Sequence, residues 1–182
     1  MKKKIIITGG LGYIGTELCK IYSGYSWNDE IIVIDNRFIS ERVNQLRNWN
    51  IEFVHGDILD KELIKKYFHD ADIVHHLAGI TNVPRVKSES NIESDNLIKK
   101  VAQEGTQNIL DVINDKCKII MPSTHVIYEG LDIVKEQIKE DEIAKPLLSY
   151  GKSKFFNEQQ LKNSGKNYII LRLGSVYGYS TD

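Results

Sequence analysis

The stretch that most constrains the fold is a glycine-rich turn near the N-terminus, Thr8-Gly9-Gly10-Leu11-Gly12-Tyr13-Ile14-Gly15. It follows three isoleucines at residues 5–7, which are typical of a strand, and it precedes residues 13–22, whose apolar positions have helical spacing. Between a strand and a helix, such glycines permit a tight turn and let the backbone approach a pyrophosphate closely. The amide groups at the start of the helix then bind the phosphates. The turn therefore predicts a dinucleotide site.

An acidic residue follows the next predicted strand. Residues 31–34 are apolar, and Asp35 comes directly after them, 20 residues past Gly15. A carboxylate at this place accepts hydrogen bonds from the hydroxyls of a ribose. Because Asp35 would repel a 2′-phosphate, the sequence predicts that NAD is preferred over NADP. Arg37 is the nearby cation that would favour the phosphate.

Predicted strands and helices alternate along the whole chain, which indicates an α/β fold with a doubly wound parallel sheet, the Rossmann fold. We expect six or more strands, helices on both faces, and one NAD-binding domain over residues 1–182. The expected strands cover 5–7, 31–34, 51–55, 73–77, 118–121 and 168–173, and the expected helices cover 13–22, 40–48, 60–68, 92–113 and 149–164. Asp60 is a candidate N-cap, and Gly165 is a candidate C-cap.

Polar or small residues follow each of these strands. In a parallel sheet the carboxyl ends of the strands meet at one edge, where ligands bind. We therefore expect the glycine-rich turn to lie near five other groups, which are Asp35, Asp57, Ala78-Gly79, Ser123-Thr124 and the segment Ser175 to Tyr177.

The segment Tyr150-Gly151-Lys152-Ser153-Lys154 opens the last predicted helix and suggests acid–base chemistry. Tyr150 and Lys154 are four residues apart and so share one helical face. A free tyrosine has a pKa of about 10, but a nearby ammonium favours the phenolate and lowers that pKa. Tyr150 would then take a proton from a hydroxyl while hydride leaves the same carbon for an oxidised nicotinamide. Thr124 would hold that hydroxyl by a hydrogen bond.

Composition argues against several other functions. The chain has 24 Lys plus Arg residues and 25 Asp plus Glu residues, so it has no basic excess to bind nucleic acid or an anionic membrane. No apolar stretch is long enough to span a bilayer, and the two cysteines have no metal or redox spacing, so a cytoplasmic protein is expected. His75 and His76 are neighbours on a predicted strand and point to opposite faces, so no metal site is expected there.

The motifs together resemble an extended short-chain dehydrogenase/reductase of the NAD-dependent epimerase/dehydratase family, and within it most closely the UDP-glucose 4-epimerases. The matching stretches are TGGLGYIG at Thr8, IDN at Ile34, GDI at Gly56, HLAG at His76, GTQN at Gly105, ST at Ser123, YGKSK at Tyr150 and LRLGSVYG at Leu171. The resemblance implies that Tyr150, Lys154 and Thr124 are catalytic. It also implies NAD contacts from Gly9, Gly12, Tyr13, Ile14, Gly15, Asp35, Asn36, Asp57, Ile58, Leu77, Ala78, Ser123, Tyr150 and Lys154.

The chain departs from the family pattern at three places. Ala102 stands where members often have asparagine, and Glu129 separates Tyr128 from the glycine that normally follows it. Members also carry a further C-terminal portion that binds the nucleotide sugar, which we interpret as absent here, so the chain alone is expected to be inactive.

The resemblance implies a substrate and a reaction. The substrate is a nucleotide-diphosphate sugar, and epimerisation proceeds by oxidation and re-reduction of a hydroxyl through a ketose. Dehydratases place two carboxylates directly after the catalytic threonine, and here those positions hold His125 and Val126. A dehydratase, a reductase or a non-catalytic NAD-binding module stays open as an alternative. Members often pair as homodimers through the helices that here start near Ile92 and Ser149, and we expect the same surface here, with Phe155 or Phe156 in it.

Overall fold

The fold is built on one sheet of six parallel strands, in the order β3-β2-β1-β4-β5-β6. The computed structural model describes residues 2–25, 28–81, 91–131 and 137–178. The sequence also predicts a loop that contains Pro84, and this loop lies outside the described residues. The strands are β1 (Lys4–Thr8), β2 (Glu30–Asp35), β3 (Glu52–His55), β4 (Ile73–His76), β5 (Lys118–Thr124) and β6 (Asn167–Leu173). This strand order is that of the doubly wound dinucleotide-binding fold, so the predicted Rossmann fold is confirmed.

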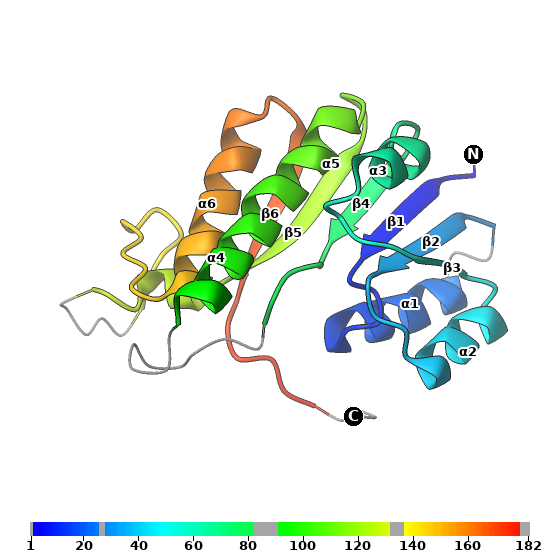
Figure 1. Ribbon diagram of the computed structural model, residues 1–182, viewed down its shortest axis with the longest axis horizontal. Coiled ribbons are helices and arrows are strands. Elements are labelled where there is room, and N and C mark those ends of the chain that lie inside the picture. The colour runs from blue at the N-terminus through cyan, green and yellow to red at the C-terminus, as the bar shows by residue number, and fades with distance from the viewer. Residues whose placement is uncertain (1, 26–27, 82–90, 132–136, 179–182) are drawn as a thin grey trace.

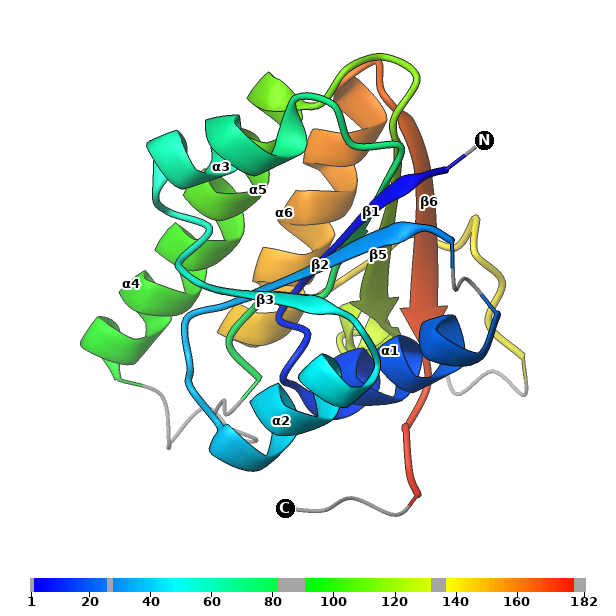
Figure 2. The same ribbon diagram turned by 90° about the vertical axis from the view of Figure 1, so that its right-hand side faces the viewer.

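Helices cover both faces of the sheet (Figures 1 and 2). One face carries α1 (Tyr13–Tyr25) and α2 (Ser40–Asn48). The other carries α3 (Lys61–Phe68), α4 (Ile92–Lys100), α5 (Thr106–Val112) and α6 (Ser149–Asn163). Alternate residues of β1 point to different faces: Ile5 and Ile7 belong to the core under α1 and α2, whereas Ile6 belongs to the larger core under α3, α5 and α6.

Two predicted helix ends are confirmed in detail. The Asp60 carboxylate accepts hydrogen bonds from the backbone N–H groups of Glu62 and Leu63, so Asp60 is the N-cap of α3. Gly165 follows the last residues of α6 with a φ of +70°, the left-handed conformation that commonly ends a helix.

The prediction of a single helix over residues 92–113 is wrong in the middle of that range. A π-helical turn, η2 (Val101–Gly105), separates α4 from α5. Side chains of α6 bind the carbonyl groups of this turn, since the Asn157 amide donates to the Ala102 oxygen at 2.8 Å and the Gln160 amide to the Gln103 oxygen at 3.0 Å. These contacts, which helical periodicity does not reveal, favour the wider turn. Turns of this kind are frequent at functional sites.

The glycine-rich turn is packed too closely for side chains at two positions. A Cβ on Gly9, whose φ is +67°, would lie 2.8 Å from backbone atoms of Ala78. A Cβ on Gly15 would lie 2.6 Å from the Gly10 Cα atom and 2.7 Å from the Gly9 oxygen. These glycines therefore let β1, the turn and α1 approach each other and the end of β4.

The substitution Gly15→Ala tests this close packing. We expect it to lower the free energy of unfolding by about 2–3 kcal/mol, because the backbone must shift to admit the methyl group. Gly24→Ala is the matched control in the same helix, since a Cβ there meets nothing within 4 Å. It should leave stability unchanged or raise it by up to about 1 kcal/mol. Urea denaturation measures both, and equal effects of the two substitutions would contradict the packing argument.

Candidate active site

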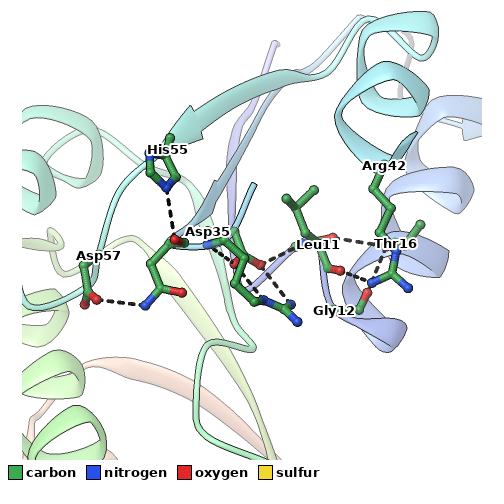
Figure 3. A network of polar contacts seen from close by, with 10 residues as sticks. Leu11, Gly12, Thr16, Asp35, Arg42, His55 and Asp57 are labelled. Atoms are coloured by element: carbon green, nitrogen blue, oxygen red, sulfur yellow. Dashed lines mark hydrogen bonds and ion pairs between the residues drawn. The ribbon is translucent and has the colours of Figure 1, made fainter. Parts of the chain in front are cut away.

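The glycine-rich turn is held from both sides at Leu11 (Figure 3). The Leu11 N–H donates to the Asp35 carboxylate at 3.0 Å, and the Arg42 guanidinium donates to the Leu11 carbonyl. Asp35 ends β2, and Arg42 comes from α2. Inside the turn, the Gly12 N–H donates to the Gly9 oxygen at 3.0 Å. The turn is therefore fixed with the start of α1 at the carboxyl edge of the sheet.

Asp35 lies where the sequence predicts it, in a buried position beside the turn. Its carboxylate also accepts the Arg37 N–H at 3.0 Å and pairs with the Arg37 guanidinium, whose Nε lies 3.3 Å away. The Arg37 side chain is 55% exposed, so it can turn toward solvent at small cost. Each Asp35 oxygen would then keep one backbone N–H donor and have a lone pair left to accept a ribose hydroxyl.

The ends of β2 and β3 form the next part of the same edge. The Asn36 amide donates to the Asp57 carboxylate at 2.9 Å, and the His55 Nε2 lies 3.0 Å from the Asn36 carbonyl oxygen (Figure 3). Ile58 is buried against Gly105, where a Cβ would lie 2.3 Å from an Ile58 methyl carbon. The predicted cofactor contacts Asn36, Asp57 and Ile58 therefore lie together beyond Asp35.

Tyr13 and Ile14 begin α1 next to the turn, and 38% of the Ile14 side chain is exposed. A Cβ on Gly178 would lie 2.5 Å from the Tyr13 hydroxyl oxygen, so the segment after β6 passes close to this tyrosine. Leu77 and Ala78 follow β4, and the Ala78 N–H donates to the Thr8 hydroxyl at 3.1 Å. These four predicted contacts surround the turn.

At the end of β5, two neighbouring hydroxyl groups have different partners. The Ser123 hydroxyl donates to Glu158 of α6 at 2.6 Å, so its proton is already used within the protein while its oxygen can still accept. The Thr124 hydroxyl accepts the Val126 N–H at 3.2 Å and caps η3 (His125–Tyr128), which leaves its own proton to donate. Both residues are buried.

Tyr150 and Lys154 lie in the first half of α6. The Lys154 ammonium donates to the Pro122 carbonyl at 3.1 Å. The Lys154 Nζ also lies near Gly79, where an added Cβ would be 3.8 Å from it. The lysine therefore joins α6 to the ends of β5 and β4. Burial lowers the pKa of Lys154 to about 8, so the ammonium stays largely protonated at neutral pH.

The expected effect of Lys154 on Tyr150 is not seen in the protein alone. Burial raises the pKa of Tyr150 above its ordinary value. The sequence predicts the effect of the nearby ammonium but not that of burial. Burial removes water from the phenolate and so disfavours it. Any lowering of the pKa of Tyr150 must therefore come from groups that bind beside it.

Sequence reasoning missed the residues that hold α6 on the sheet. The Glu158 carboxylate accepts two hydrogen bonds from Arg172 of β6, at 3.0 and 2.6 Å. Burial alone would raise the pKa of Glu158, but hydrogen bonds from Arg172 and Ser123 bring it below its ordinary value. Arg42, which holds the glycine-rich turn, was missed as well, because a charged residue in a polar helix gives no signal of a buried contact.

The residues present suit a bound dinucleotide. The close packing of Gly9 and Gly15 lets the turn present backbone amides at the start of α1, and a buried carboxylate stands beside it. Among the residues that the structure describes, no cluster of three or more His, Cys, Asp or Glu side chains could hold a metal ion. His75 and His76 have partners on opposite faces, Tyr22 for the first and Thr8 and Thr106 for the second.

Residues 5–182 match the model of the NAD-dependent epimerase/dehydratase family. The chain belongs to this family. It is 32% identical to a putative UDP-glucose 4-epimerase of Methanocaldococcus jannaschii, over 98% of this chain and 57% of that protein. It is also 32% identical to a dTDP-D-glucose 4,6-dehydratase of Dictyostelium discoideum, over 97% of this chain and 44% of that protein.

Solved structures support the same family. The UDP-glucose 4-epimerase of Brucella ovis in complex with NAD is 27% identical and superposes with a TM-score of 0.73, over 93% of this chain and 51% of that one. The chain thus spans about half the length of the relatives it matches. No helix in the described ranges is both long and apolar enough to cross a membrane.

Proposed function

We propose that the protein is an NAD-dependent epimerase of nucleotide sugars, similar to UDP-glucose 4-epimerase, and that residues 1–182 form its NAD-binding domain. The observation that carries this proposal is the placement of Lys154. Its buried ammonium contacts the end of β5 and lies close to Gly79 after β4, on the helix that also bears Tyr150. This placement supports a proton-transfer role for Tyr150 and Lys154 at the edge of the sheet that holds the glycine-rich turn and Asp35.

In this proposal NAD, when bound, accepts a hydride from the sugar and returns it. Tyr150 takes the proton of the reacting hydroxyl and later gives it back. The positive charge of Lys154, together with that of an oxidised nicotinamide bound beside Tyr150, would favour the phenolate against the cost of its burial. Thr124 donates its remaining proton to the sugar oxygen and holds it in line.

The surroundings of Glu129 favour an epimerase over a dehydratase. Eliminating water needs a further acid and base near the threonine, and Glu129 is the nearest carboxylate that follows it in the chain. Its carboxylate accepts the backbone N–H groups of Leu147 and Leu148 at 2.6 and 2.7 Å. Through one oxygen, Oε1, Glu129 therefore holds the chain that leads into α6, which gives this carboxylate a structural role. The identity to a dehydratase keeps that reaction as the second candidate.

Cofactor choice tests the role of Asp35. Isothermal calorimetry should show that residues 1–182 bind NAD at least tenfold more tightly than NADP, because the carboxylate repels a 2′-phosphate. Asp35→Asn should weaken NAD binding by about tenfold, since one charged hydrogen bond is lost while an oxygen stays to accept the Leu11 N–H. Arg37→Ser is the matched control and should leave NAD affinity within about threefold. Equal or tighter binding of NADP would contradict the assignment.

Substitution of Tyr150 tests the acid–base role. In a form of the protein that turns over a nucleotide sugar, Tyr150→Phe should lower kcat by about 100-fold or more, because the proton acceptor is removed. In residues 1–182 the same change should leave NAD affinity nearly unaltered, whereas Lys154→Ala should weaken it. Near-normal kcat in Tyr150→Phe would rule out the mechanism. Binding of NAD without any turnover, in a protein that carries a sugar domain, would favour a non-catalytic module.

We also propose that the protein forms a homodimer through α4, α5 and α6. A hollow of about 290 Å³ lies between α5 and α6, and Phe156 lines it with 40% of its surface exposed. Leu97 on α4 is 52% exposed. These apolar side chains are suited to an isologous contact, in which each helix meets its copy.

Sedimentation equilibrium tests the dimer. The unmodified chain should show a mass near twice that of the monomer, and Phe156→Glu should shift it to the monomer, because a charge in an apolar interface is costly. Tyr25→Glu, at an exposed position at the end of α1, is the control and should leave the mass unchanged. A monomer at all concentrations in the unmodified chain would contradict the proposal.

A further inference from the structure

A row of hydrogen bonds crosses the interior behind the candidate active site. It begins at the Ala78 N–H, which donates to the Thr8 hydroxyl at the end of β1. The Thr8 oxygen lies 3.0 Å from the Nδ1 atom of His76, and the Nε2 atom of His76 lies 3.0 Å from the hydroxyl oxygen of Thr106. The Asn157 amide of α6 donates to that same Thr106 oxygen at 2.9 Å.

The row connects the two walls of the candidate site. Ala78 and Thr8 belong to the strand ends, where Gly9 packs directly on the Ala78 backbone. Asn157 lies one turn beyond Lys154 on α6, and its amide also binds the Ala102 carbonyl in the π-helical turn. His76 stands between them and is 3% exposed, so water does not substitute for its partners. Every position along the row is therefore set by a direct contact.

His76 has the hydrogen-bonding capacity that this place requires. A neutral imidazole carries one donor and one acceptor on opposite sides of a rigid ring, and a hydroxyl can serve either of them. Burial, and then the positive charge of Lys154, lower the pKa of His76 to about 3. The ring therefore adds no second positive charge beside the Lys154 ammonium.

From this geometry we propose that His76 is a positioning residue that sets the spacing between the cofactor-binding strand ends and the helix that bears Tyr150 and Lys154. The inference rests on the proposed function, because that spacing matters where a cofactor lies between the two walls. His76 acts through Thr8 and Ala78 on one side and through Thr106 and Asn157 on the other. Loss of either link lets α6 move relative to the glycine-rich turn.

Thr106 offers the sharpest test, because it is buried in α5 and reaches the candidate site through His76. Thr106→Val keeps the shape but removes the hydroxyl, and we expect it to weaken NAD binding by residues 1–182 about tenfold. Thr106→Ser restores the hydroxyl and should return the affinity to within about threefold of the original chain. His69→Leu is the control, because His69 is an exposed histidine that follows α3, and it should leave the NAD affinity unchanged.

A second readout needs no cofactor. The ¹⁵N NMR spectrum of the ring should show His76 as a single neutral tautomer that does not protonate above about pH 4, and Thr106→Val should allow the two tautomers to average. If the unmodified chain fails to bind NAD, the proposed function fails while this readout still tests the row. Unchanged NAD affinity in a folded Thr106→Val chain, or a His76 ring that titrates near pH 6.5, would overturn the proposal.

Discussion

The hydrogen bond between the Leu11 N–H and the buried Asp35 carboxylate is the contact on which the rest of the site depends. It fixes the glycine-rich turn against the end of β2, while Gly9 packs on Ala78 at the end of β4. The parallel strands then bring each following segment to the same edge. One short turn thus fixes the start of α1 relative to the ends of β2 and β4, where we propose that the cofactor binds.

Buried charges fix the second wall, helix α6. Glu158 is fully buried and pairs with Arg172 of β6, and the Lys154 ammonium rests on the carbonyl of Pro122. Removal of one member of such a pair leaves an uncompensated charge in the interior, which costs about 3–5 kcal/mol. These contacts fix the position of Tyr150. Hydrogen bonds and ion pairs are directional, so they hold α6 at one place along the sheet more strictly than apolar contacts would.

Local sequence patterns predicted most of the fold, because isoleucine runs, glycine turns and helical spacing act over a few residues. The strands, the cap at Asp60 and the role of Gly165 all follow from such patterns. The π-helical turn at Val101, the hydrogen bond from Arg42 to Leu11 and the Glu158–Arg172 pair depend on partners 14 to 57 residues away, and no local pattern predicts them. That burial raises the pKa of Tyr150 could not be predicted from the sequence either, because burial is a tertiary property.

The central claim is that the carboxyl ends of these strands form one NAD site facing Tyr150 and Lys154. A crystal structure of residues 1–182 with NAD tests it most directly. We expect the pyrophosphate at the backbone amides of residues 12–14, the adenosine ribose in contact with Asp35, and the nicotinamide beside Tyr150 and Lys154. NAD bound at another face of the sheet, or with its nicotinamide at Asp35, would contradict it.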